Sequence, residues 1–162
     1  MTLTLGTDLT NELIAAADRD SITKYVVGAA IHDPEGRVLI MRRAAGDFMG
    51  GLWELPSGSV DRGEGLLEAL HREVKEETGL QLVTVESYLG HFDYTSGSGK
   101  RARQFTFAAT ANVATTVRLS PDEHDAYLWA DETEQNRVSE DVRTVLGTWK
   151  IRAGRPGRHL QA

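Results

Sequence analysis

The chain has 162 residues, 24 acidic and 18 basic side chains, and a net charge of −6 with histidine neutral. This length favours one domain with a sizeable core, and a 40% hydrophobic share excludes a mainly disordered chain. A pI of about 5.4 argues against a binder of nucleic-acid polymers, although a few arginines can still hold a small phosphorylated ligand. The lack of cysteine excludes disulfides, cysteine zinc sites and cysteine nucleophiles.

No membrane segment or leader is expected. The apolar run at residues 26–31 is far too short to span a bilayer. The N-terminus lacks the basic region and the long apolar region of a signal peptide. We therefore expect a cytoplasmic protein without a membrane partner.

The first part of the chain predicts a helix followed by a hairpin. Residues 8–20 carry apolar side chains at helical spacing and predict a helix, within an N-terminal extension of residues 1–20. Residues 25–31 are apolar and β-branched and predict a buried strand. The turn sequence at residues 33–36 predicts that this strand forms a hairpin with residues 38–41.

The rest of the chain alternates strands with two helices. The expected elements are a short strand at 52–55, a helix at 66–78 ended by Gly79, strands at 81–89, 103–111 and 125–130, and a helix at 139–150. Residues 96–99 predict a flexible tip, and the basic tail at 152–162 is expected to fray. Strands outnumber helices in a mixed order, which predicts a single α+β or α/β domain with helices packed on a mixed β-sheet.

The helix at 66–78 carries three carboxylates on one face. Glu73, Glu76 and Glu77 fall within an arc of about 100°, beside the apolar stripe of the same helix. Like charges at these spacings repel each other, and Arg72 can reach Glu76 but cannot neutralise all three. A divalent cation can do so, and a set of oxygen ligands suits Mg²⁺, with Mn²⁺ as an alternative.

A solvated charged helix face is the alternative interpretation of such a cluster. The surrounding spacing argues against it: Gly58, five residues, Glu64, seven residues, then Arg72-Glu73-Val74-Lys75-Glu76-Glu77-Thr78-Gly79-Leu80. Average residue usage puts a chance match to all the fixed positions at about 10⁻⁸ to 10⁻⁷ per chain. The segment resembles the Nudix box, and it matches that motif at every fixed position.

Upstream residues are similar to the MutT-type branch of this family. Arg42-Arg43-Ala44-Ala45, Met49, Glu54 and Pro56 carry this likeness. The resemblance implies an α/β/α sandwich that hydrolyses a nucleoside diphosphate linked to another group. It also implies that Glu73, Glu76 and Glu77 bind Mg²⁺, together with the backbone carbonyl of Ser57. Arg72 would orient a glutamate, and Glu64 would hold Arg72.

Other site residues are less firmly indicated. The acidic loop at residues 121–125 offers Glu123 as an extra ligand or general base, and His124 as a weaker proton acceptor. Arg43, Arg101 and Arg103 are candidates for phosphate binding. Phe48, Trp53 and Tyr94 are candidates for stacking on a base, although buried tryptophans are more often core residues.

The leading functional prediction is a Mg²⁺-dependent pyrophosphohydrolase that cleaves a nucleoside di- or triphosphate. ADP-ribose or a nucleotide sugar is an alternative substrate. A nucleotide-sensing module that no longer hydrolyses, and a dimerising scaffold whose acidic face is structural, are alternatives from other classes. The expected partner is a small nucleotide, and a homodimer is possible.

Overall fold

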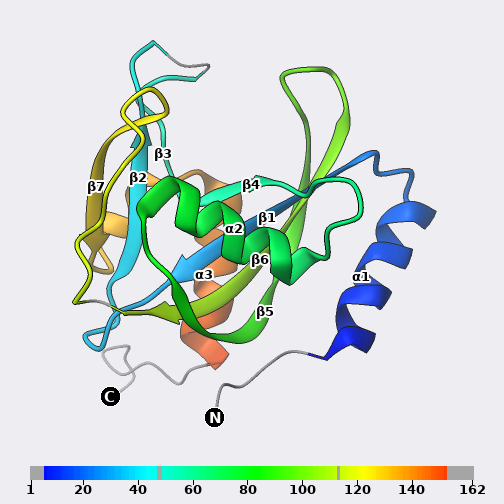
Figure 1. Cartoon of the computed structure of the whole chain (residues 1–162), viewed down its shortest axis with the longest axis horizontal. Helices are drawn as coiled ribbons and strands as arrows, with labels where there is room; N and C mark the ends of the chain where they lie inside the picture. The colour runs from blue at the N-terminus through cyan, green and yellow to red at the C-terminus, as the bar shows by residue number, and fades with distance from the viewer. Residues whose placement is uncertain (1–5, 47–48, 113, 153–162) are drawn as a thin grey trace.

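The computed structural model describes residues 6–46, 49–112 and 114–152. Of residues 151 and 152 it describes the backbone only. Figure 1 shows the arrangement of its helices and strands. In chain order these are α1 (Thr7–Arg19), β1 (Lys24–Ile31), β2 (Val38–Arg43), β3 (Trp53–Glu54), β4 (Ser57–Ser59), α2 (Leu66–Thr78), β5 (Leu82–Thr95), β6 (Arg101–Ala111), β7 (His124–Ala130), the 3₁₀ helix η1 (Glu134–Arg137) and α3 (Glu140–Arg152).

The strands form two sheets. The larger has the order β4-β1-β6-β5, in which β1 runs parallel to β6 and the other pairs are antiparallel. The smaller has the order β3-β2-β7 and is antiparallel throughout. Parallel pairing of β1 with β6 requires a long connection, and the segment that contains α2 and β5 provides it.

Helices cover both faces of the strands (Figure 1). Alternate residues of β6 point to opposite sides: Phe105 and Phe107 join a core with α2, while Ala108 joins a second core with α3. The first core includes Leu70 of α2. The second includes Trp149 of α3. The expected mixed sheet between helices is therefore confirmed as an α/β/α sandwich.

The predicted hairpin between residues 25–31 and 38–41 is wrong. β1 takes β4 and β6 as its neighbours, whereas β2 pairs with β3 and β7 in the other sheet. The turn is present, because the amide of Gly36 donates to the carbonyl of Asp33. Beyond it, a single bridge joins His32 to Val38 before the strands separate.

The structure also adds or lengthens elements. The strand expected at 81–89 continues to Thr95 because it pairs with β6 as far as Thr95 opposite Arg101. β4 and η1 were not predicted. α3 includes Arg152, which was assigned to the tail, and the rest of that tail lies outside the described residues. None of the described helices combines the length and apolar character needed to cross a membrane.

Packing of α2 on the sheet gives a test of this fold. Leu70 is 1% exposed within the core beneath α2, and we expect Leu70→Ala to lower the free energy of unfolding by about 2–5 kcal/mol. Val83 is 53% exposed, so Val83→Ala is the control and should change stability by no more than about 0.5 kcal/mol. Urea unfolding measures both. Equal, small effects of the two changes would contradict this packing.

Candidate functional site

A cleft of about 760 Å³ lies between the two sheets and α2. Residues from β1, β2, β3, β4, α2, β5, β6 and the starts of β7 and α3 line it. The carboxylates that the sequence placed on one helix face lie in its wall: Glu73, Glu76 and Glu77. Their exposure is graded, since Glu77 is buried, Glu73 is half-buried and Glu76 is exposed.

The ends of α2 set the register of these carboxylates. The amide of Gly65 donates to the Glu68 carboxylate at 2.7 Å, which occupies a free backbone donor at the helix start. Gly79 ends the helix with φ 76°, a left-handed conformation that glycine adopts without strain. Leu70 and Val74 bury the adjacent stripe and fix the rotation of the helix about its axis.

The strand β4 holds two of the glutamates. The carboxylate of Glu73 packs directly over Gly58, where the Cβ of any other residue would overlap it. The amide of Ser57 donates to Oε1 of Glu77 at 2.9 Å. Ser57 lines the cleft and has no left-handed φ, so a serine here is compatible with the strand. The glycine of the motif is thus explained by close approach of a side chain to the backbone.

Arg72 organises the acidic helix face. Its Nε and Nη2 donate to both oxygens of Glu64, at 2.7 and 2.9 Å. Nη1 donates to Glu73 at 2.9 Å and to Glu76 at 3.3 Å, and Nη2 also donates to the carbonyl of Ser59. Arg72 therefore lies between Glu64 and two of the three clustered carboxylates, and among the described residues its hydrogen bonds do not include one to Glu77.

The pKa of Glu64 is shifted downward, whereas the pKa values of Glu73 and Glu77 are shifted upward. The hydrogen bond from Arg72, followed by one from the amide of Asp61, lowers the pKa of Glu64 to about 2. Burial raises the pKa of Glu77 to about 9; the bond from Ser57 opposes this shift, and the charges of nearby glutamates add to it. Burial also raises the pKa of Glu73, against the hydrogen bond from Arg72. The site thus has a surplus of carboxylates over positive charge.

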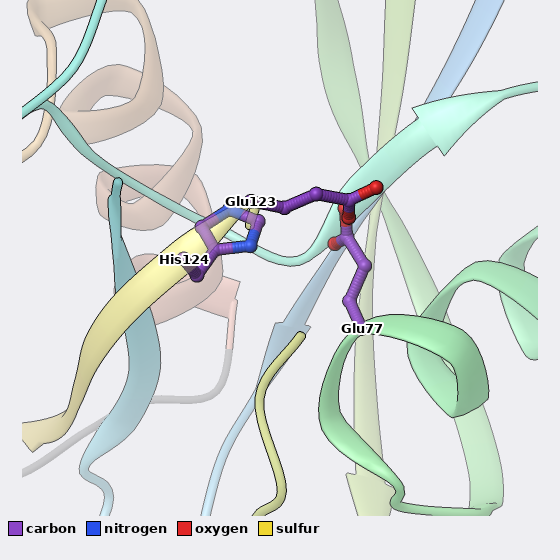
Figure 2. A group of neighbouring side chains, drawn as sticks. All are labelled: Glu77, Glu123 and His124. Carbon is purple, nitrogen blue, oxygen red and sulfur yellow. The ribbon is translucent and has the colours of Figure 1, made fainter. Parts of the chain in front are cut away.

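A second group of side chains faces Glu77 from the start of β7. Figure 2 shows Glu123 and His124 directed toward the Glu77 carboxylate. One potential ligand atom from each of the three lies within 4.8 Å of the others. His124 is 3% exposed, and its Nε2 lies 2.8 Å from Oε2 of Glu54. Glu54 also accepts bonds from Nη1 of Arg43, at 3.0 and 3.2 Å.

The candidate phosphate-binding arginines separate into two groups. Arg43 lines the cleft. Arg103 is 4% exposed and is bonded to Asp93 and Asp20, and it does not line the cleft. Arg101 is exposed, lies 4.0 Å from Asp93, and is likewise absent from the cleft wall. The structure therefore does not bring Arg101 or Arg103 into the cleft that holds the α2 glutamates.

The stacking candidates Trp53 and Tyr94 both line the cleft. The ring of Trp53 has the guanidinium carbons of Arg42 and Arg137 at 5.9 and 5.3 Å. Phe48 lies outside the described residues. Glu54 had no predicted catalytic or binding role, and His124 was predicted only as a proton acceptor, because the bond between them joins residues 70 positions apart.

Comparisons with known proteins agree with this geometry. A family model described as the NUDIX domain matches residues 23–146, well over half of the chain. An isopentenyl-diphosphate Delta-isomerase from Clavibacter sepedonicus is 34% identical over 117 residues, which cover 70% of this chain and 62% of the isomerase. The CTP pyrophosphohydrolase of Escherichia coli is 29% identical over 133 residues, which cover 80% of this chain and 95% of that protein.

A solved structure supports the same assignment. The MutT protein from Methanosarcina mazei Go1 is similar with a TM-score of 0.69 and 26% identity, over 80% of this chain and 94% of that one. Residues 23–146, which the family model matches, contain α2, β4 and the loop that carries Glu123. The family model therefore covers the acidic cleft. The chain belongs to the Nudix hydrolase family.

Proposed function

We propose that the protein is a divalent-cation-dependent pyrophosphohydrolase that cleaves the diphosphate bond of a nucleoside triphosphate or another nucleoside diphosphate derivative. The observation that carries this proposal is the surplus of buried carboxylate in the cleft wall, centred on Glu77. A cleft of about 760 Å³ has the size of a small-molecule site.

The donor set fits Mg²⁺. Glu73, Glu76 and Glu77 offer only oxygen atoms, and Ser57, whose amide donates to Glu77, lines the same cleft and carries a carbonyl oxygen as well. Burial that raises the pKa of Glu77 favours a bound proton or a bound cation over a bare charge. When bound, Mg²⁺ neutralises phosphate charge and lowers the pKa of a coordinated water.

The chain's own residues have separate tasks in this proposal. Arg72 holds the carboxylates of Glu73 and Glu76 in position and is itself fixed by Glu64. Glu123 is exposed at the cleft and can accept a proton from the attacking water or complete a cation site. Arg43 lines the cleft, and its guanidinium group can bind a phosphate of the substrate.

Substrate choice depends on the remaining cleft wall. Trp53 and Tyr94 present aromatic surface for a nucleoside base. Two relatives are named as a CTP pyrophosphohydrolase and an isopentenyl-diphosphate Delta-isomerase, and both CTP and isopentenyl diphosphate contain a phosphoanhydride. The match to the CTP pyrophosphohydrolase covers 95% of that protein. This favours a nucleoside triphosphate as the substrate of this chain. ADP-ribose and nucleotide sugars offer the same diphosphate to the cleft and remain the second candidate class.

Turnover of a nucleotide panel tests the proposal directly. Purified protein with Mg²⁺ should release a nucleoside monophosphate and pyrophosphate from at least one nucleoside triphosphate, or two monophosphates from a nucleotide conjugate. Chromatographic identification of both products distinguishes these substrate classes. If no triphosphate, dinucleoside polyphosphate or nucleotide sugar were cleaved with Mg²⁺ or Mn²⁺, the proposed activity would be wrong.

Single charge removals on α2 test the cation ligands. Glu76→Gln and Glu77→Gln should each lower kcat/KM by about 100-fold or more with the fold intact, because each removes an anionic ligand. Glu68→Gln is the matched control, since Glu68 lies on the same helix outside the cleft and its amide oxygen can still accept from Gly65. Equal rates in all three variants would contradict the ligand assignment.

The raised pKa of Glu77 predicts a pH dependence of stability without metal. The folded pKa is about 9 and the ordinary value is 4.5, so the folded state keeps an extra proton between these values. The stabilisation is complete below about pH 4.5 and is lost as the pH rises toward 9, by up to ~1.4 kcal/mol per pH unit.

Denaturant unfolding in chelator at several pH values measures this effect. Glu77→Gln should reduce the decline of stability above pH 5, and Mg²⁺ should restore the stability of the unmutated protein at pH 8 to 9. The same pH slope in both proteins would show that Glu77 is ionised in the metal-free fold.

A further inference from the structure

The cleft contains a buried nitrogen atom that no step of the proposed reaction uses. His124 is 3% exposed, and its Nδ1 has no hydrogen-bond partner among the residues that the structure describes. An unpaired polar atom in such a place is costly unless a ligand satisfies it. In Figure 2 the imidazole ring faces the carboxylates of Glu77 and Glu123.

The other nitrogen of this ring fixes its tautomer. Nε2 lies 2.8 Å from the Glu54 carboxylate, which can only accept, so Nε2 carries the proton and donates it. In the neutral ring, Nδ1 then presents a lone pair. A carboxylate behind a histidine in this way is the arrangement that orients histidine ligands in metalloproteins.

We infer that His124 Nδ1, Glu77 and Glu123 form a mixed nitrogen and oxygen site for a divalent transition-metal ion, which this site prefers over Mg²⁺. Imidazole suits ions such as Co²⁺ and Zn²⁺, whereas Mg²⁺ selects oxygen ligands. The inference rests on the proposed function only in that Glu77 is a cation ligand in both.

The distances allow one ion to be shared. Ligand atoms that bind one ion at about 2.0–2.2 Å lie at most about 4.4 Å from each other. One potential ligand atom of each residue, for His124 a ring nitrogen, lies within 4.8 Å of the others. Glu123 is exposed and can close the small remainder by rotating its side chain, while Glu77 and His124 are fixed by Ser57 and Glu54.

Pulsed EPR with Mn²⁺ as the probe tests nitrogen ligation without any nucleotide. The full chain is prepared at natural abundance and with ¹⁵N-labelled histidine. We expect a ¹⁴N hyperfine coupling that changes to a ¹⁵N coupling on labelling. It should be absent in His124→Gln and retained in His32→Gln. His32 is the matched control because it also bonds a carboxylate, Glu86 at 2.7 Å, but does not line the cleft.

Metal affinity provides the second measurement. In calorimetric titrations, His124→Gln should raise the Kd of Co²⁺ by about 10- to 100-fold and that of Mg²⁺ by about twofold at most. If His124→Gln does not fold, Glu123→Gln replaces it, because Glu123 is exposed; its Co²⁺ Kd should rise at least tenfold. No histidine coupling in the unmutated protein, or an unchanged Co²⁺ Kd in the folded variant, overturns the inference.

The two proposals fail separately. Mg²⁺-dependent nucleotide cleavage without histidine coupling to Mn²⁺ would overturn the mixed-ligand site and leave the proposed function standing. Histidine coupling in a protein that cleaves no nucleotide would support the mixed-ligand site and overturn the proposed function.

Discussion

Burial of Glu77 against β4 is the constraint on which the rest of the site depends. A carboxylate that is 9% exposed and lies near other glutamates is unfavourable as a bare charge. Within the part of the chain that the structure describes, its hydrogen-bond donor is the neutral amide of Ser57. Arg72 instead donates hydrogen bonds to Glu64, Glu73 and Glu76. The fold therefore keeps one carboxylate short of positive charge at the cleft wall, where a cation can supply it.

The short strand β4 links the sheet to this chemistry. Gly58 lets the Glu73 carboxylate approach the backbone, and Ser57 fixes Glu77, so two consecutive residues set the positions of two helix side chains. β4 is itself held by antiparallel pairing with β1 in the larger sheet. The cluster is thus built on regular elements rather than on loops, which suits a site that must hold its geometry without a bound ion.

Local signals predicted that the three carboxylates of α2 share one face of the helix, whereas tertiary pairings did not follow from sequence. The spacing of Glu73, Glu76 and Glu77 and the stop at Gly79 are properties of one helix. The predicted hairpin failed because the partners of β1 lie 29 to 33 residues away in β4 and 78 residues away in β6, and a turn sequence does not report them. Arg103 was a reasonable phosphate candidate, yet its ion pair with Asp20 joins residues 83 positions apart.

The two sides of the cleft differ in how their residues are brought together, and this difference bears on substrate specificity. The proposed cation ligands come from one helix and one strand, but the wall opposite them combines β2, β3 and the start of β7. Glu54 connects that wall, because its carboxylate accepts from both Arg43 and His124. Its charge also adds to the raised pKa of Glu77. Glu54 therefore joins a side chain beside the proposed cation site to the arginine proposed for phosphate binding, through one carboxylate.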